Sequence, residues 1–471
     1  MNARLAAEDA AQLIIDEELI RRFNKSGPRY TSYPSADRFQ ASFGALDYHQ
    51  ALKRRAALLE AGQAAPLSLY VHIPFCASLC YYCACNKVIT KNKGQGGEYI
   101  RYLQRELQLA SQHMPAGQSL RQLHFGGGTP TFLNNAELTQ LMDILRAGFV
   151  FEDGAELGIE IDPRTVSHNS MAQLAALGFN RTSFGVQDFD AAVQQAVHRI
   201  QPYAMVQEAM QAARENGFSS INVDLIYGLP KQNLGSFDAT ISQVLELMPD
   251  RIALYNYAHL PQRFKPQRRI LEADLPSAEE RLQIFLLSLR RLTEAGYVYI
   301  GLDHFARPDD SLSQALRDHR LHRNFQGYTT SAECDLLALG ASSIGLIGDA
   351  YVQAQRELPQ YYAMLDAGVL PVEKGFHFSR DEKLRRTVIQ HIMCARPLDF
   401  AAFGQAWQID FSAYFAPELA RLQSYQDMDL IQLDAQGLRI TARGRMFVRA
   451  VAMEFDAFLH QATQATYSRL I

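Results

Sequence analysis

Between residues 67 and 260, short apolar segments alternate with segments of helical periodicity, and this order limits the folds open to the chain. Alternating strands and helices pack as β/α units around a parallel sheet. Six such units are fewer than the eight that close a TIM barrel, so we predict an α/β fold with an open, partial (β/α)6 barrel. The predicted strands span residues 67–73, 120–125, 156–161, 181–186, 221–228 and 251–257.

The segments between these strands carry apolar residues at three- and four-residue spacing, which is typical of helices that bury one face. Gly217, directly after Asn216, marks the end of one of them. The predicted helices span residues 98–113, 136–149, 170–179, 205–218 and 236–248.

Mostly polar residues stand where the predicted strands end. Thr129, Asp162 and Gln187 follow three of the strands, Ala258 follows a fourth, and Asp224 lies inside its strand. Parallel β/α sheets carry their active sites at the C-terminal ends of the strands. We therefore expect the functional site at this edge of the sheet.

The rest of the chain differs from the barrel. Residues 261–281 contain three prolines and five basic residues, which predicts a loop leaving the barrel, followed by a helix near 279–295 and a strand over 297–305. From about residue 371 the pattern predicts helices, a hairpin turning at Gln436 and Gly437, and a closing helix, which is similar to a winged-helix module. The predicted parts are an N-terminal helical arm over 1–60, the barrel with C-terminal extension strands over 61–365, and a mostly helical C-terminal domain over 366–471.

Four of the six cysteines lie between residues 76 and 85. The N-terminal residues mix acidic and apolar side chains and lack the apolar stretch of a signal peptide or membrane span, so a cytoplasmic protein is expected. Thiols stay reduced there, and clustered cysteines are then better explained as metal ligands than as disulfides. The other two, Cys334 and Cys394, stand in apolar segments and are expected to be buried.

Cys76, Cys80 and Cys83 follow the first predicted strand with C-x3-C-x2-C spacing. Three thiolates on one loop can bind an iron–sulfur cluster and leave one iron open to an outside molecule. Cys85 comes two residues after Cys83, too close to reach the same cluster comfortably, so a role near the substrate or cofactor is expected. A structural zinc site on all four thiolates is the alternative, although such sites usually draw two separated cysteine pairs.

Two further motifs follow predicted strands. In HFGGGTP, the glycines at 126–128 remove side chains so that a ligand can approach the backbone. In GIEIDP, Glu160 and Asp162 project to the same side of their strand. Buried carboxylates, Asp224 included, need a partner such as a ribose hydroxyl, an ammonium group or an arginine, for which Arg199 is a candidate. An internal salt bridge is the plain alternative.

The formal net charge of −4 and the pI of about 6.4 leave no basic excess to neutralise a phosphate backbone, so we expect no nucleic-acid partner. A zinc-containing nucleic-acid-binding protein that uses the C-terminal hairpin as a wing is the alternative from another class, because the segment TARGRMFVR carries basic side chains. Nothing in the sequence indicates an obligate interface, so a monomer is expected.

The blocks YVHIPFC, HFGGGTPT, IEIDPR, FGVQDF, NVDLIYGLPKQ and HRNFQGYTT, together with the C-x3-C-x2-C-x-C loop, resemble the oxygen-independent coproporphyrinogen III oxidase family of radical S-adenosylmethionine (SAM) enzymes. The resemblance spans nearly the whole chain, from NKSGPRYTSYP to ITARGRMFVR. It implies a [4Fe-4S] cluster on Cys76, Cys80 and Cys83, and two S-adenosyl-L-methionine molecules.

The resemblance also implies binding residues for both S-adenosylmethionine molecules. For the first, whose methionine end binds the open iron, the matching positions are Tyr70, Gly127, Glu160, Ala258 and Ile344. For the second, they are Tyr82, Gly128, Thr129, Gln187, Arg199 and Asp224. Position 82 is often Phe in the family, so Tyr82 is a departure that keeps an aromatic face. Tyr70 and Cys85 are the candidate catalytic residues.

The implied reaction is the oxidative decarboxylation of two propionates of coproporphyrinogen III to vinyl groups, giving protoporphyrinogen IX in haem biosynthesis. An electron from an external low-potential donor cleaves S-adenosylmethionine into methionine and a 5'-deoxyadenosyl radical. That radical takes a hydrogen from the propionate, carbon dioxide leaves, and an unidentified terminal acceptor takes the remaining electron. Neither a membrane nor a nucleic acid is implied.

Within the family, a haem-binding or haem-degrading relative is the alternative. Such relatives generally lack the C-x-C ending of the cysteine loop and the NKSGPRYTSYP arm, and both are present here.

A tetracarboxylate substrate requires local positive charge in a chain whose net charge is −4. The candidate carboxylate-binding residues are Arg29, Arg263, Arg268, Arg269, Arg307 and Arg323.

Overall fold

The structure, a computed structural model, describes residues 17–23, 26–115, 117–331 and 334–459. The chain divides into two compact units. The barrel unit comprises Phe39–Ser288 and Glu333–His377, and the terminal unit comprises Met1–Arg38, Leu289–Ala332 and Phe378–Ile471. These boundaries differ from the domain limits predicted at residues 60 and 365, and the three-part scheme stays a prediction.

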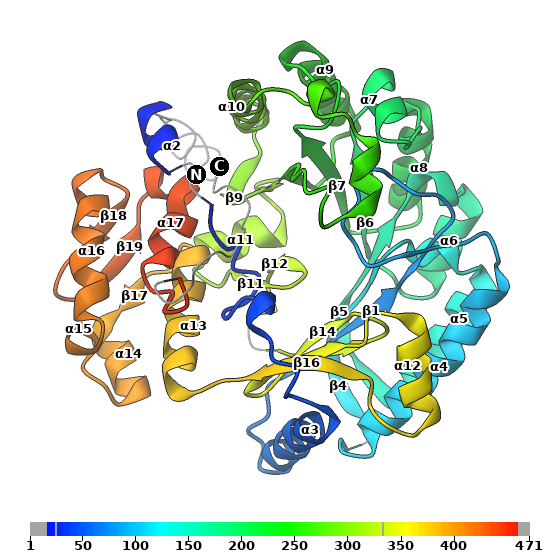
Figure 1. Cartoon of the computed structure of the whole chain (residues 1–471), viewed down its shortest axis with the longest axis horizontal. Helices are drawn as coiled ribbons and strands as arrows, with labels where there is room; N and C mark the ends of the chain where they lie inside the picture. Colours follow the sequence, from blue (N-terminus) through cyan, green and yellow to red (C-terminus); the bar gives the residue numbers. More distant parts are fainter. Residues whose placement is uncertain (1–16, 24–25, 116, 332–333, 460–471) are drawn as a thin grey trace. The chain divides into compact units, whose positions relative to one another are not determined.

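The barrel unit is built on a sheet whose six central strands are parallel and consecutive in the chain (Figure 1). All six predicted strands are confirmed, with ends that differ by a few residues. They are β1 (Leu67–Ile73), β4 (Gln118–Gly127), β5 (Phe149–Ile161), β6 (Arg181–Gln187), β7 (Ser220–Tyr227) and β8 (Arg251–Asn256).

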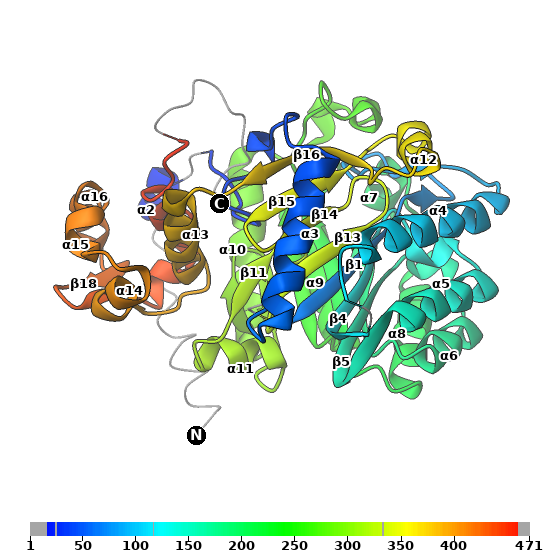
Figure 2. The same cartoon turned by 90° about the horizontal axis from the view of Figure 1, so that it is seen from below.

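Four later strands extend the sheet on the other side of β1. The first, β13 (Asp335–Leu339), pairs parallel with β1. The next three pair antiparallel in sequence order: β14 (Ile344–Ile347), β15 (Ala350–Ala354) and β16 (Val372–His377). Helix α3 (Ala45–Glu60) lies across these extension strands (Figure 2).

Helices cover the outer face of the parallel strands (Figure 2). The five predicted helices are confirmed, and Asn216 and Gly217, the latter with φ +82°, end one of them as expected. The helices of this unit are α4 (Gly94–Ser111), α5 (Asn135–Gly148), α6 (His168–Ala176), α7 (Ala191–Ala196), α8 (Tyr203–Glu215), α9 (Leu234–Leu247) and α12 (Leu358–Asp366). Helix α10 (Ala278–Glu294) contains the boundary at Ser288.

The alternation of side chains along each strand separates the core from the site. On β6, Thr182, Phe184 and Val186 are buried, whereas the residues between them are half-buried. On β7 the same alternation buries Val223 and leaves Asp224 half-buried. Successive side chains of a strand point to opposite faces, so the apolar residues pack under the helices and the polar ones face the barrel interior.

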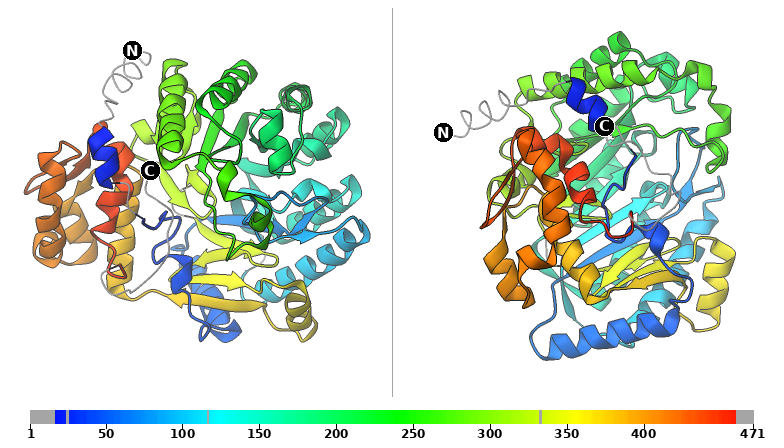
Figure 3. Two further views of the ribbon diagram at one scale, coloured as in Figure 1. Left: turned by 45° about the horizontal axis from the view of Figure 1, so that its top comes forward. Right: turned by 60° about the vertical axis from the view of Figure 1, so that its left-hand side comes forward.

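The terminal unit contains the segments before and after the barrel unit and Leu289–Ala332, which stands between the two barrel segments in the sequence (Figure 3). Its strands before the C-terminal domain are β9 (Val298–Gly301), β10 (His304–Ala306), β11 (His322–Asn324) and β12 (Gly327–Thr329), and its helices there are α2 (Glu17–Phe23) and α11 (Ser311–Arg317). The single strand predicted over 297–305 is wrong, because the chain turns between β9 and β10 and the two pair antiparallel. Gly301 and Leu302, with φ of +144° and +50°, make this turn.

The C-terminal part of this unit has helices α13 (Arg380–Met393), α14 (Phe400–Trp407), α15 (Phe411–Tyr414), α16 (Ala416–Asp427) and α17 (Val448–Met453). The predicted hairpin and closing helix are confirmed. Strands β18 (Ile431–Leu433) and β19 (Gly437–Ile440) form the hairpin, and β17 (Leu398–Asp399) pairs with the other edge of β19. Cys394 is buried as expected, and Cys334 of the barrel unit is half-buried. Among the described residues, no helix is both long enough and apolar enough to cross a membrane.

Glu106 of α4 is a buried carboxyl that accepts hydrogen bonds from the Tyr361 hydroxyl (2.6 Å) and the Gly340 N–H (2.7 Å). Burial raises the pKa of Glu106 to about 7, and the two hydrogen bonds oppose it only in part. The pKa of Glu106 in the folded chain therefore exceeds its ordinary value of 4.5. The proton on Glu106 stabilises the folded chain fully below pH 4.5, and this contribution to the free energy of unfolding is lost as the pH rises through 7.

We expect the wild type to lose roughly 3 kcal/mol of unfolding free energy relative to Glu106→Gln across this pH window. Chemical denaturation of both proteins at intervals between about pH 5 and pH 8 measures the difference. Stability curves that stay parallel over this range would contradict the assignment.

Candidate active site

The four clustered cysteines lie on a loop directly after β1, and a pair of two-residue strands closes the loop. Strand β2 (Phe75–Cys76) pairs parallel with β3 (Val88–Ile89). Inside the loop, the Lys87 ammonium donates to the carbonyls of Cys83 (3.1 Å) and Cys85 (3.2 Å). These contacts hold the backbone of Cys83 and Cys85 next to the Lys87 side chain.

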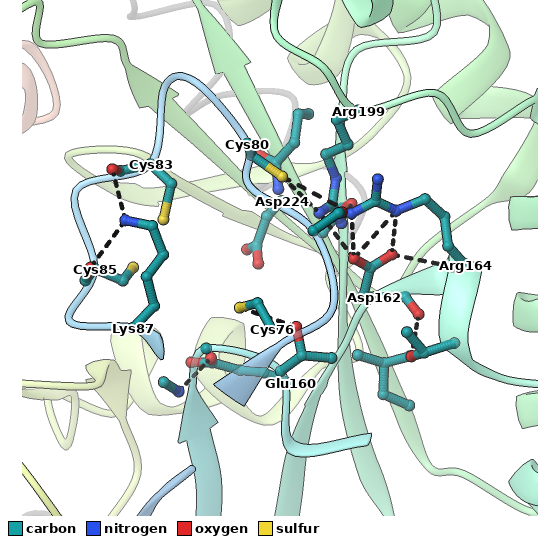
Figure 4. A pocket seen from close by; sticks show the side chains of 18 of the residues that line it. Cys76, Cys80, Cys83, Cys85, Lys87, Glu160, Asp162, Arg164, Arg199 and Asp224 are labelled. Carbon is teal, nitrogen blue, oxygen red and sulfur yellow. Dashed lines mark hydrogen bonds and ion pairs between the residues drawn. The ribbon is translucent and has the colours of Figure 1, made fainter. Parts of the chain in front are cut away.

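The thiols open into one cavity of about 460 Å³ at the C-terminal ends of the strands (Figure 4). The thiols and the strand ends thus meet at one cavity, at the edge of the sheet where we expect the site. The sequence-derived candidates that line the cavity are Cys76, Cys80, Tyr82, Cys83, Cys85, Gly127, Gly128, Thr129, Glu160, Gln187, Arg199 and Asp224. Residues that sequence reasoning did not single out also line it, among them Lys87, Arg164, Thr165, Ser183 and Tyr255.

The thiols differ in their surroundings. Burial raises the pKa of Cys76 to about 11, although the Thr129 hydroxyl, 3.5 Å from its sulfur, works in the other direction. A hydrogen bond from the Cys85 thiol lowers the pKa of Cys83 to about 6 against the effect of burial, and Lys87 adds to this lowering. The same hydrogen bond raises the pKa of Cys85.

The donor set fits a [4Fe-4S] cluster better than a single metal ion. In the described part of the chain, no three His, Cys, Asp or Glu side chains are close enough together to hold one ion. A tetrahedral zinc would need four such donors around one point. An iron–sulfur cluster instead takes each thiolate on a different iron, which requires sulfurs spaced around a cavity, as Cys76, Cys80 and Cys83 are in Figure 4.

The glycine run joins the cysteine loop to the strand ends. A Cβ at Gly128 would lie 2.7 Å from the Pro74 carbonyl oxygen and 2.8 Å from that of Phe75, in the two residues that precede Cys76. Gly127 has φ +117°, and its N–H donates to the Glu160 carboxylate at 3.0 Å. Only glycine permits this close approach.

Glu160 on β5 and Asp162, the residue directly after this strand, both line the cavity. Burial raises the pKa of Glu160, but the contact with His124 (3.4 Å) and the Gly127 N–H outweigh it, so the pKa lies below its ordinary value. Glu160 is therefore a carboxylate at neutral pH and can bind a cation.

Asp162 and Arg199 form an ion pair with 3.0 Å between oxygen and nitrogen. Arg199, the candidate partner of the buried carboxylates, therefore pairs with Asp162. Arg164 binds the same carboxylate at 2.7 Å. For Asp162 the plain alternative of an internal salt bridge is thus confirmed.

Asp224 has neutral partners. Its carboxyl accepts hydrogen bonds from Ser183 and from Asn222, both at 2.8 Å. Burial, with the charge of Glu160, raises the pKa of Asp224 to about 6 despite these hydrogen bonds. No arginine or lysine is among its partners in the described residues, which leaves the carboxyl available to a ligand in the cavity.

Three candidates carried over from the resemblance are not among the described residues that line the cavity. The Tyr70 hydroxyl contacts His72 at 3.1 Å, and its ring stacks on His124. The Ala258 carbonyl accepts a hydrogen bond from Gln267, and Ile344 begins β14. Their assigned roles stay predictions.

The six candidate arginines also lie outside the lining of this cavity. Arg263, Arg268 and Arg269 belong to the barrel unit, and Arg29, Arg307 and Arg323 to the terminal unit. Arg269 donates to the Tyr81 hydroxyl at 3.2 Å, and Arg29 pairs with Asp303. Which of them bind substrate carboxylates stays a prediction.

Comparisons with known proteins agree with this site. Residues 70–244 match the model of the radical SAM superfamily, and residues 378–447 match the HemN C-terminal domain. The chain is 48% identical to the oxygen-independent coproporphyrinogen III oxidase of Pseudomonas aeruginosa, over 97% of this chain and 98% of the relative. It is 45% identical to the enzyme of the same name from Escherichia coli, over 98% and 99%.

The chain belongs to the oxygen-independent coproporphyrinogen III oxidase family. The solved structure of the Escherichia coli coproporphyrinogen III oxidase HemN, described as a radical SAM enzyme, superimposes with a TM-score of 0.89 at 44% identity, covering 95% of this chain and 100% of the other. As a member of this family, the chain is an oxidoreductase with the radical SAM fold that uses a [4Fe-4S] cluster and S-adenosylmethionine. Membership decides against the zinc-containing nucleic-acid-binding alternative.

Proposed function

We propose that this chain catalyses the oxygen-independent oxidative decarboxylation of two propionates of coproporphyrinogen III, giving protoporphyrinogen IX. The observation that carries the proposal is the set of three thiols that open into one cavity at the barrel edge, in a chain that matches enzymes of this name over nearly its whole length. The bound cluster supplies the electron that cleaves S-adenosylmethionine into methionine and a 5'-deoxyadenosyl radical.

The protein's own side chains bind and orient. Cys76, Cys80 and Cys83 hold the cluster, and Glu160 with the Gly127 backbone offers a charged acceptor for the ammonium of the methionine end. Asp224 and Gln187 also line the cavity, where hydroxyl and ammonium groups of a second S-adenosylmethionine would bind. Holding the reacting groups in place and excluding water are the main contributions of a protein to cofactor chemistry of this kind.

The partners follow from the same proposal. The tetracarboxylate substrate requires arginines, for which the six candidates named above form the pool. An external low-potential carrier delivers the electron, and a separate acceptor takes the last one. We place the reaction in the cytoplasm, with a monomer as the working unit and neither a membrane nor a nucleic acid as a partner.

Anaerobic turnover of the purified enzyme with S-adenosylmethionine, a reductant and coproporphyrinogen III tests the function. We expect methionine, 5'-deoxyadenosine and protoporphyrinogen IX, and no haem consumption in a parallel reaction. Haem binding or breakdown without conversion of the porphyrinogen would favour the haem-binding or haem-degrading relative instead.

Glu160→Gln tests the assignment of the methionine end. The variant removes the negative charge that Glu160 offers to the ammonium of the methionine end, while its amide oxygen can still accept the Gly127 N–H. Hydrogen bonds to charged groups contribute about 1.5–3 kcal/mol, so affinity for S-adenosylmethionine should fall about 10–100-fold. Equilibrium dialysis against the anaerobic enzyme measures the dissociation constant. Glu156→Gln is the matched control, because Glu156 lies on the same side of β5 and pairs with Arg181 (2.7 Å) away from the cavity. Equal affinities in both variants would refute the role.

A further inference from the structure

Each cysteine assigned to the cluster has a different polar neighbour, and Cys80 has two guanidinium groups. Arg199 Nη1 lies 3.5 Å from the Cys80 sulfur, and Arg164 Nη2 lies 3.8 Å from it. Figure 4 shows both guanidiniums on the Cys80 side of the cavity, with the Asp162 carboxylate between them. By contrast, the neighbour of Cys76 is a neutral hydroxyl, that of Thr129.

Asp162 holds Arg164 in one orientation. Arg164 Nε donates to both carboxylate oxygens (2.9 and 3.2 Å), Nη2 donates to Oδ2 (2.7 Å), and the Arg164 backbone N–H donates to Oδ1 (3.0 Å). A bidentate arginine–carboxylate contact fixes the plane of the guanidinium. The second N–H of Nη2 is thereby directed at the Cys80 sulfur.

The charges around Cys80 do not cancel. One carboxylate faces two guanidiniums, which leaves one net positive charge next to the sulfur. Asp162 and Arg199 are both buried, so solvent and salt screen this charge weakly. Positive charge and hydrogen bonds at a cluster thiolate stabilise the state that carries the extra electron.

The two arginines differ in their other contacts. Arg199 also donates to the Gly185 carbonyl (2.6 Å), a contact that supports the end of β6. Within the described residues, the side-chain hydrogen bonds of Arg164 go to Asp162 and Cys80. Arg164 can therefore be changed with less effect on the barrel itself.

We propose that Arg164 is a positioning residue that donates to the Cys80 thiolate and raises the reduction potential of the cluster, so that an external one-electron donor can reduce it. The proposal rests on the proposed function only in taking Cys80 as a cluster ligand. It adds Arg164 to the residues of the site and gives the Arg164–Asp162–Arg199 group a role in electron uptake.

The test compares Arg164→Met, Arg164→Gln and Arg164→Lys with Arg181→Met. Arg181 is the matched control because its side chain has the same exposed fraction as that of Arg164, 21%, and also pairs with a carboxylate, but at the start of β6, outside the cavity lining. Anaerobic redox titration without S-adenosylmethionine, monitored by electron paramagnetic resonance, measures the midpoint potential, and iron analysis measures cluster content.

We expect Arg164→Met and Arg164→Gln to keep their iron and shift the potential to more negative values. Arg164→Lys should recover most of the shift, because it keeps the charge, and Arg181→Met should match the wild type. Potentials of Arg164→Met and Arg164→Gln that equal the wild-type value would overturn the proposal, as would loss of iron in all three Arg164 variants with none in Arg181→Met. Absence of a reducible iron–sulfur signal in the wild-type protein would instead contradict the proposed function. Failure of the Arg164 proposal and failure of the proposed function therefore give different results.

Discussion

We expect Cys80→Ser to form no methionine, 5'-deoxyadenosine or protoporphyrinogen IX above the level of a reaction without enzyme. A serine hydroxyl is a poor substitute for a thiolate on iron, and with two thiolates left the cluster loses one of its three protein ligands. Anaerobic turnover and iron analysis of the purified variant measure the loss.

Two other cysteines provide the controls for this result. Cys334→Ser changes a half-buried thiol of the barrel unit that does not line the cavity, and it should keep both iron and activity. Cys85→Ser should keep four irons per chain, because Cys85 is not needed as a ligand, whatever its effect on turnover. A Cys80→Ser protein that retains four irons and forms all three products contradicts the assignment of the cluster ligands.

We expect Gly128→Ala to lose the cluster, although Gly128 contributes no side chain to the site. The added methyl group would lie 2.7 and 2.8 Å from the carbonyl oxygens of Pro74 and Phe75, which directly precede Cys76. Overpacking of this kind lowers the free energy of unfolding by about 1–3 kcal/mol. We expect the backbone at Pro74 and Phe75 to move away from the methyl group and to displace Cys76 with it. Lower iron content, lower thermal stability and lost turnover are the measured results.

Gly97→Ala is the matched control for that glycine. It lies in α4, where the nearest atom to an added Cβ is a carboxylate oxygen of Glu137 at 3.7 Å, an ordinary contact. Alanine in a helix interior is favoured over glycine by about 0.5–1 kcal/mol, so this variant should be at least as stable as the wild type and keep its iron. The explanation fails if both variants behave alike.

The barrel was predictable because its elements are local and strongly patterned. Each parallel strand is a short apolar run, and each helix buries one face, so periodicity finds both. The order of the strands in the sheet was not predictable. Strand β13 pairs with β1 although most of the barrel sequence separates them, and no local pattern indicates which strands will be neighbours. The turn at Gly301 and Leu302 was missed for a similar reason, since a strand-like composition continues through it.

The site was predictable where spacing or strand alternation carries the chemistry. Cys76, Cys80 and Cys83 follow from their spacing. Glu160 and Asp162 follow from period-two alternation, which continues from β5 to the residue directly after it. Arg164 was missed because it follows the strand, where no periodicity applies, although its position two residues after a buried carboxylate is a usable signal. Which arginine pairs with which acid depends on tertiary packing, so the Arg199–Asp162 pair needed the structure.

The two-residue pairing of β2 with β3 joins Phe75 to Val88 and Cys76 to Ile89. The pairing holds the two ends of the loop that carries Cys80, Cys83 and Cys85 next to each other. A chain segment whose ends are fixed has fewer accessible conformations than an open one. Two paired residues on each side therefore limit how far these three thiols can move away from Cys76.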